Sequence, residues 1–286
     1  MGIPVSVCIV ARDEAENIRR CLKSVQWADD RFVVLDDRTT DATESIASEF
    51  GARVIRHVYE GDVEQRNFSL DQARHDWVFS MDADECSTPA LASAIGQAIE
   101  MDGRGASGFR INRLTYYLGR WLRHGDFYPD WQLRLFKRSE SRWEGRNPHG
   151  RVVVAGRVDR LSGDLQHYSY RDLADQVERI QAFSEIQAQA LHEAGVRTTA
   201  SRLVLRPPFR FLRSYLWKRG FLDGVAGFIG AGATAFYVFL KYAKLWERSR
   251  ALGRQANPSS SAQLRTGREA AVSSHDARPT GPNPNA

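Results

Sequence analysis

The chain has 286 residues, 42% hydrophobic and 26% charged, which describes a globular protein and excludes a disordered one. Its three cysteines form no CxxC pair, so they indicate neither a disulfide framework nor a zinc site, and they fit a reducing compartment. The net charge of +5 is uneven, because residues 202–254 hold eleven Lys and Arg against two acids, a net +9 that leaves about −4 elsewhere. Positive charge confined to one segment argues against a nucleic-acid binder.

The first hundred residues alternate between strand and helix patterns. The predicted strands are residues 5–10, 31–36, 52–57 and 76–82, and the predicted helices are residues 14–25, 41–50, 62–74 and 88–100. Asp41 and Thr88 are expected to cap the second and fourth helices, with Pro89 at the first position of the fourth. Such alternation predicts an α/β protein whose parallel sheet is covered by helices on both faces.

Polar residues follow every one of these strands. They are Arg12, Asp13 and Glu14 after the first strand, Asp36 and Asp37 at the second, Gln65, Arg66 and Asn67 beyond the third, and Asp82 and Asp84 at the fourth. In parallel sheets, ligands bind beyond the carboxyl ends of the strands. Four polar strand ends on one edge therefore predict a binding site there.

The fourth strand ends in "VFSMDADECS", with three acids in four positions, Asp82, Asp84 and Glu85. These carboxylates repel one another and need a compensating charge, for which a bound divalent cation is an obvious candidate. A solvated or helix-capping cluster of loop acids is the alternative.

From Gly108 the alternation stops. Strand patterns follow over residues 108–121, 131–138 and 150–158, then a long amphipathic helix over residues 170–195. Residues 224–240 are seventeen uncharged residues that include four glycines. Seventeen is the lower limit for a membrane-spanning helix, so an interfacial or re-entrant element is favoured, with a buried helical hairpin as the alternative. We expect peripheral attachment to the cytoplasmic membrane surface through residues 209–250.

Two stretches of the first half, "VSVCIVARDEAENIRRCLKSV" and "EGDVEQRNFSLDQARHDWVFSMDADE", resemble the nucleotide-sugar domain of family 2 glycosyltransferases. Asp82-Ala83-Asp84 matches the DxD metal motif of that family. The later "NRLTYYLGRWLRHGDFYPDWQLRLFKR" and "RPPFRFLRSYLWKRGFLDG" resemble a narrower branch, the bacterial lipopolysaccharide inner-core β-1,4-glucosyltransferases. The resemblance implies a GT-A fold, a Rossmann-like and mostly parallel sheet with helices on both faces, followed by an amphipathic helical segment that associates with membranes.

The resemblance, the basic charge of residues 202–254 and the Ser-, Asn-, Pro- and Gly-rich composition after Gly253 together predict a division of the chain into four parts. They are a nucleotide-sugar half (1–107), an acceptor-binding and catalytic half (108–170), a helical, basic, membrane-associating segment (171–252) and a disordered tail (253–286).

The resemblance also implies roles for individual residues. Asp36 accepts a hydrogen bond from the uracil of a UDP-sugar, and Arg66 lies near the base or the diphosphate. Mg²⁺ or Mn²⁺ is held at the fourth strand end. The nucleotide-binding set is Ala11, Arg12, Asp13, Glu14, Asp36, Arg66 and Asp82, and the metal set is Asp84, Asp82 and His167.

Family members invert the anomeric centre, and a base takes the proton of the acceptor hydroxyl. Many carry a His-Glu pair after "WEGR", but here His149 is followed by Gly150. The substitutes in the acceptor loops are Asp130, Glu144 and Asp126, of which Asp130 is favoured because it begins a strand-like segment rich in sugar-binding groups. A set of aromatic residues between the two halves forms either an acceptor platform or a second hydrophobic cluster. They are Tyr116, Tyr117, Trp121, Phe127, Tyr128, Trp131 and Trp143.

The leading expectation is an inverting, metal-dependent transferase that moves a hexose, glucose from UDP-glucose, onto the lipopolysaccharide inner core. A sugar-nucleotide nucleotidyltransferase is the second reading, but "ARDEAEN" lacks the glycine-rich loop that it needs after the first strand. An inactive relative that binds nucleotide or glycan is the third, supported by the missing Glu at position 150.

Overall fold

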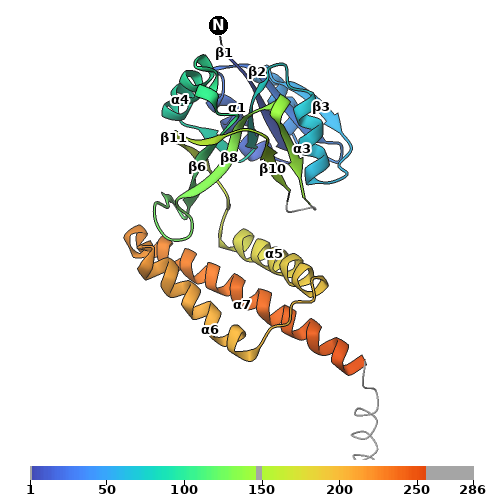
Figure 1. Cartoon of the computed structure of the whole chain (residues 1–286), viewed down its shortest axis with the longest axis vertical. Coiled ribbons are helices and arrows are strands. Elements are labelled where there is room, and N and C mark those ends of the chain that lie inside the picture. The colour runs from blue at the N-terminus through green and yellow to red at the C-terminus, as the bar shows by residue number, and fades with distance from the viewer. Residues whose placement is uncertain (1, 146–149, 256–286) are drawn as a thin grey trace, which may run out of the picture. The chain divides into compact units, whose positions relative to one another are not determined.

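The structure is a computed structural model that describes residues 2–145 and 150–255 (Figure 1). His149 and the predicted tail from residue 256 onward lie outside the described residues. Chain contacts divide the described part into two compact units, residues 2–177 with 211–233, and residues 178–210 with 234–255. Each unit is described by itself below.

The first unit is built on a nine-stranded sheet with strand order β3-β2-β1-β4-β8-β6-β11-β5 and with β7 paired to β6. The strands are β1 (Ile3–Ala11), β2 (Ala28–Asp36), β3 (Arg53–His57), β4 (Trp77–Asp82), β5 (Glu85–Ser87), β6 (Gly108–Tyr117), β7 (Arg120–Trp121), β8 (Asp130–Lys137) and β11 (Val158–His167). A separate two-stranded sheet pairs β9 (Ser141–Glu144) with β10 (Arg151–Val154).

The first four strands are parallel and in the predicted places, and β8 then runs antiparallel to both β4 and β6. The α/β class is confirmed, and each antiparallel pair includes at least one strand that follows Gly108 in the chain. The strand predicted over residues 150–158 is wrong as one element. Residues 151–154 form β10, which pairs with β9, and Val158 begins β11, which pairs with β6 in the main sheet. Ala155, Gly156 and Arg157 connect the two strands.

Helices cover both faces of the sheet. The helices are α1 (Ala15–Ser24), α2 (Thr43–Glu49), α3 (Asp62–Asp71) and α4 (Pro89–Glu100). One face buries Ile18 of α1, Ala47 of α2 and Ile95 of α4 in a single apolar cluster with the strands. The other face buries Leu70 of α3 together with Phe32 and Trp143. Burial on both faces explains why the central strands read as continuous apolar runs.

The two cap predictions have different outcomes. Thr88 caps α4 as predicted, since its side chain accepts a hydrogen bond from Leu91 N at 3.2 Å and Pro89 follows at the first position. Asp41 is not the cap of α2, because that helix begins at Thr43 after Ala42. Its carboxylate instead accepts hydrogen bonds from Thr43 N and Ala15 N, both at 2.9 Å, and so ties the loop after β2 to the start of α1.

The chain ends in helices, with short 3₁₀ and π turns between them. They are α5 (Leu173–Glu193), α6 (Ala200–Leu212), a π-helical turn (Arg213–Trp217), a 3₁₀ turn (Gly220–Asp223) and α7 (Gly224–Gln255). In the second unit, Ala188 of α5 packs on Tyr242 and Leu245 of α7. Among the described residues, one helical stretch, Gly220–Arg250, has the length and apolar composition to cross a membrane. Its most apolar window has a mean hydropathy of 1.4 and is 28% buried.

Candidate active site

The carboxyl ends of the first four strands meet on one edge of the sheet, called the rim here. Val10 of β1 pairs with Val34 on one side and with Asp82 on the other, and Asp36 pairs with His57 one strand further out. The predicted juxtaposition of the four strand ends is therefore present in the fold.

The acids that end β4 are neutralised by arginines. Arg66 of α3 donates to Asp82 Oδ1 at 2.7 Å, and Arg134 of β8 donates to Asp82 Oδ2 at 2.5 Å. The same Arg134 nitrogen donates to Glu85 Oε1 at 2.6 Å, and Arg113 of β6 lies 3.8 Å from that oxygen. The compensating charge expected from a cation is thus supplied at Asp82 and Glu85 by protein side chains.

Burial and the neighbouring charges shift the pKa values of Asp82 and Glu85 in opposite directions. Burial opposes the ionisation of Asp82, but Arg134 and Arg66 outweigh it and hold the pKa of that carboxyl well below its usual range. Burial of Glu85, 0% exposed, raises its pKa above the ordinary value despite Arg134. The pKa of Arg134 is itself raised, because burial is outweighed by the two acids. Asp82 is therefore a fixed negative charge inside an arginine clamp.

Asp84 has a different environment. Its Oδ2 lies 3.3 Å from His167 Nε2, and its backbone carbonyl accepts a hydrogen bond from Tyr168 N at 2.9 Å. His167 ends β11, which pairs with β5 directly after the acids, so the sheet itself sets this approach. Two ligand atoms at right angles around one divalent ion lie about 3 Å apart, given bonds of about 2.1 Å. Asp84 and His167 fit one ion together, whereas both oxygens of Asp82 are engaged by arginines.

The described residues contain no cluster of three or more His, Cys, Asp or Glu side chains arranged to hold a metal. Asp84 and His167 would therefore supply only part of a coordination shell. Mg²⁺ commonly uses one or two carboxylates and completes its shell with phosphate oxygens and water. The donor set suits an ion that arrives with a phosphorylated ligand.

The first and second strand ends are joined by polar contacts. Asp36, 3% exposed, receives two side-chain hydrogen bonds from Arg38, at 2.9 and 2.6 Å, and lies 3.9 Å from Arg12 Nε. Hydrogen bonds from Arg38, acting against burial, lower the pKa of Asp36 to about 2. Asp13, with φ of 50°, accepts a hydrogen bond from Thr40 N at 2.8 Å. A ligand N–H that binds Asp36 has to compete with Arg38.

The other predicted nucleotide-binding residues lie on the same rim. Ala11 is buried and pairs with Leu35 at the end of β2, and Glu14 N donates to Thr43 Oγ1 at 2.8 Å. Arg66 is held by Asp62 as well as Asp82, and its guanidinium lies 4.7 Å from the centroid of the Trp143 ring. Its Nη1 is buried with no hydrogen-bond partner among the described residues, which leaves a donor for an incoming anion.

The three candidate bases have distinct surroundings. Asp130 begins β8 at the rim, where Arg113 Nε donates to its Oδ2 at 2.8 Å and Gln132 donates to its Oδ1 at 2.6 Å. Asp126 is 7% exposed at its side chain and forms ion pairs with Arg213 at 3.1 Å and Lys218 at 2.8 Å. Glu144 is exposed at the end of β9. Arg113 brings Asp130 next to the clamp at Glu85, while Asp126 belongs to a structural ion-pair cluster.

The aromatic set predicted between the two halves is divided by the fold. Tyr117 packs with Phe127 in a small buried cluster, and Trp143 belongs to the core under α3. Tyr116 and Trp121 form a half-buried ring cluster with Tyr168, which follows His167. This last group is partly exposed and lies beside His167, and Tyr128 and Trp131 are partly exposed next to Asp130, so these are the parts of the set suited to stacking on a sugar.

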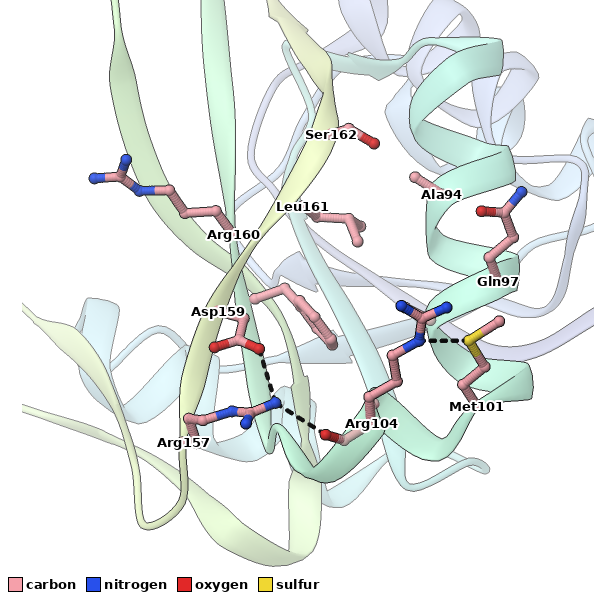
Figure 2. A pocket seen from close by; sticks show the side chains of 12 residues that line it. Ala94, Gln97, Met101, Arg104, Arg157, Asp159, Arg160, Leu161 and Ser162 are labelled. Atoms are coloured by element: carbon pink, nitrogen blue, oxygen red, sulfur yellow. Dashed lines mark hydrogen bonds and ion pairs between the residues drawn. The ribbon is translucent and has the colours of Figure 1, made fainter.

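A separate open pocket lies at the opposite edge of the sheet, between the end of α4 and the beginnings of β6 and β11 (Figure 2). Arg157 is paired there with Asp159 at 2.9 Å, and Arg160 points away from the pocket toward Trp131. This pocket contains none of the predicted site residues.

The residues that sequence reasoning missed are the arginines of the clamp, Arg134 and Arg113, while Glu85 was named in the acid cluster but given no role. One signal was present. Arg134 stands between Leu133 and Leu135 in an otherwise apolar strand, and a charge so placed needs a buried partner. The identity of that partner depends on the pairing of β8 with β4, which the residues around Arg134 do not predict.

Comparisons with known proteins give a consistent result. A family model described as "Glycosyl transferase family 2" matches residues 6–156, slightly more than half of the chain. The chain is 28% identical over 253 residues to the lipopolysaccharide core biosynthesis glycosyltransferase LpsC of Rhizobium meliloti (strain 1021), covering 86% of this chain and 93% of that protein. It is also 28% identical to the uncharacterized glycosyltransferase RT0209 of Rickettsia typhi, covering 86% and 87%.

Two solved structures are similar at lower identity. Glucosyl-3-phosphoglycerate synthase from Mycobacterium tuberculosis, in complex with phosphoglyceric acid, gives a TM-score of 0.47 at 17% identity and covers 69% of this chain and 82% of that one. S. aureus TarS 1-349 gives a TM-score of 0.43 at 15% identity and covers 87% and 91%.

Replacement of Arg134 by Met is expected to lower the free energy of unfolding by about 3–5 kcal/mol, because it removes the cation shared by the buried Glu85 carboxyl and the partly buried Asp82 carboxyl. Urea unfolding followed by circular dichroism measures this change. Arg142→Met, at an exposed position of β9, is the matched control and is expected to stay within about 0.5 kcal/mol of wild type. A loss no larger than that of the control would contradict the clamp.

Replacement of Arg38 by Met is expected to raise the pKa of Asp36 from about 2 toward its ordinary value of 3.8. Since the folded-state pKa is depressed, the stabilisation from this pair is present above pH 4 and is lost as pH falls toward 2. Titration of the Asp36 carboxyl by ¹³C NMR in both proteins measures the shift. Arg56→Met, which removes an exposed partner of Glu44 instead, should leave the Asp36 titration where it is in wild type.

Proposed function

Because this chain belongs to glycosyl transferase family 2 and has the GT-A fold, we propose that it is an inverting transferase that moves glucose from UDP-glucose onto the inner core of lipopolysaccharide. The observation that carries the proposal is the carboxylate of Asp84 beside the imidazole of His167, on the rim where the carboxyl ends of the parallel strands meet. The likeness to LpsC along nearly its whole length supports the lipopolysaccharide core as the acceptor.

The donor is proposed to lie along the rim from Asp36 to Asp84. Asp36 accepts the imide N–H of uracil once Arg38 releases it, and Asp13 and Glu14 form the adjoining wall. Arg66 offers its unpaired Nη1 to the diphosphate, which its fixed position between Asp62 and Asp82 supports. Asp84 and His167 would hold Mg²⁺ or Mn²⁺, which when bound neutralises charge on the departing diphosphate.

Asp130 is proposed as the base. The acceptor hydroxyl oxygen attacks C1 of the hexose from the face opposite the diphosphate, and the bond from C1 to the diphosphate oxygen breaks, so that UDP leaves. The hydroxyl proton passes to a carboxylate oxygen of Asp130. Arg113 holds Asp130 in one orientation at the start of β8, where the Asp130 side chain is 28% exposed. This exposure favours Asp130 over Asp126, which is 7% exposed and paired with Arg213 and Lys218.

The location is proposed to be the cytoplasmic face of the inner membrane, with peripheral attachment through residues 209–250. The excess of Lys and Arg over acids in residues 202–254 supports attraction to an anionic surface, at roughly 1 kcal/mol for each cation near it.

The first test is release of UDP from UDP-glucose by the full chain with Mg²⁺ or Mn²⁺ and a core-truncated lipopolysaccharide. Asp84→Ala is expected to reduce the rate about 100-fold or more, and chelation of divalent ions by EDTA to have a similar effect that added metal reverses. Equal rates with and without EDTA would sink the metal assignment. Nucleotide binding without turnover would instead identify an inactive relative, and diphosphate release from UTP and a sugar phosphate a nucleotidyltransferase.

The second test concerns the base. Asp130→Asn is expected to lower kcat about 10²–10⁴-fold with little change in the Kd for UDP, because the base acts on the acceptor proton and not on the nucleotide. Glu144→Gln is the matched control and is expected to retain activity within a few-fold. The reverse ranking of these two variants would move the base to β9.

A further inference from the structure

Residues 212–228, called the apolar turn here, comprise the end of α6, the turns that follow it and the start of α7. They expose large hydrophobic side chains in close succession. Trp217 is 79% exposed and Val225 is 74% exposed, and the remaining five are about half exposed. Those five are Leu212, Leu216, Phe221, Leu222 and Phe228. Contiguous exposed apolar side chains of this kind mark an interaction surface in a soluble protein.

The charges of the apolar turn favour an anionic partner. Arg219 and Lys218 are exposed between the apolar side chains. Asp223 is the only acid of residues 212–228, and it is 3% exposed. Its carboxylate points inward, accepting hydrogen bonds from Arg123 N at 3.0 Å and His124 N at 2.8 Å. The exposed charges of the turn are therefore all positive.

Exposed aromatic and aliphatic side chains interspersed with cations are the pattern of a segment that lies in a membrane interface. Tryptophan is enriched at that level of a bilayer, because its ring is apolar and its N–H is polar. The turn is also continuous with the helical stretch Gly220–Arg250, which has the composition of a membrane segment. These features favour an anionic lipid surface over a protein partner.

The apolar turn is attached to the loop that leads to the candidate base. Asp126 pairs with Arg213 and Lys218, and Gly125 N donates to Lys218 O at 3.0 Å. The aromatic ring of Phe127 packs so closely on Gly230 that a Cβ there would lie 2.8 Å from it. The loop of residues 122–129 runs from these anchors directly into Asp130 at the start of β8.

We propose that the apolar turn inserts into an anionic membrane surface and, through Asp126 and Asp223, fixes the loop 122–129 at that surface. A lipid-linked acceptor is then presented to the rim at a set distance from the bilayer. The proposed membrane contact depends only on the residues of the turn, while its consequence for catalysis rests on the proposed function.

Vesicle co-sedimentation of the full chain tests the contact. We expect binding to vesicles of phosphatidylcholine with 30% phosphatidylglycerol, and at least tenfold weaker binding to phosphatidylcholine alone, since opposite charges attract the turn. The triple variant Trp217→Ser/Phe221→Ser/Leu222→Ser should lose at least tenfold in affinity for the anionic vesicles. The double variant Val58→Ser/Met101→Ser, at exposed apolar positions outside the turn, should bind like wild type.

Circular dichroism of the triple variant checks that it is folded, and Arg219→Glu provides a second variant that leaves the apolar side chains in place. Arg219→Glu should weaken binding to the anionic vesicles only. Equal binding of wild type and the triple variant, or no binding of wild type to either vesicle, would overturn the proposal.

Activity separates this proposal from the proposed function. The triple variant should release UDP at the wild-type rate with a delipidated core oligosaccharide and at least tenfold more slowly with the intact lipopolysaccharide in anionic vesicles. A parallel loss on both acceptors would overturn the link between the turn and the acceptor loop. If wild type binds the vesicles but transfers to neither acceptor, the proposed function fails while the membrane contact stands.

Discussion

The organisation of the rim depends on one interaction, the contact of the Arg134 guanidinium with Asp82 and Glu85. It joins the end of β4 to β8 across an antiparallel pair, and it places a cation where two buried carboxyls would otherwise repel each other. Removing one partner of a buried ion pair destabilises the fold more than replacing both partners with apolar residues, because an unpaired buried charge remains. The clamp therefore fixes the geometry of the turn that carries Asp84.

The clamp also gives the two aspartates of the DxD motif different tasks. Asp82 is saturated by arginines and acts as an electrostatic anchor, whereas Asp84 faces His167 and is the carboxylate open to a ligand. Arg66, held by Asp62 and Asp82, places a positive charge beside Asp82 at the rim. A phosphorylated ligand thus meets a cation on one side of Asp82 and a partial metal shell on the other.

Periodicity in the sequence was sufficient for the first half of the fold. Apolar runs separated by amphipathic helices predicted the parallel strands, and the rule that ligands bind at their carboxyl ends predicted the rim. The arginine clamp was not predictable in this way, since Arg134 lies far from Asp82 in sequence and meets it only through the pairing of β8 with β4. The ion pairs of Asp126 were not predictable for the same reason, because its partners Arg213 and Lys218 come from a distant part of the chain.

The rim and the loop 122–129 are held in place by different interactions, which explains why only the rim carries a short sequence motif. The rim consists of strand ends whose spacing is fixed by backbone pairing, so a short stretch such as Asp82-Ala83-Asp84 is enough to place two carboxylates there. The loop 122–129, which we propose for the acceptor, is instead positioned by contacts with residues far along the chain, Arg123 with Asp223 and Asp126 with Arg213. Ion pairs of this kind tolerate many local sequences as long as the two partners are kept. The position of the loop therefore depends on its pairing with residues of the apolar turn and not on the rim.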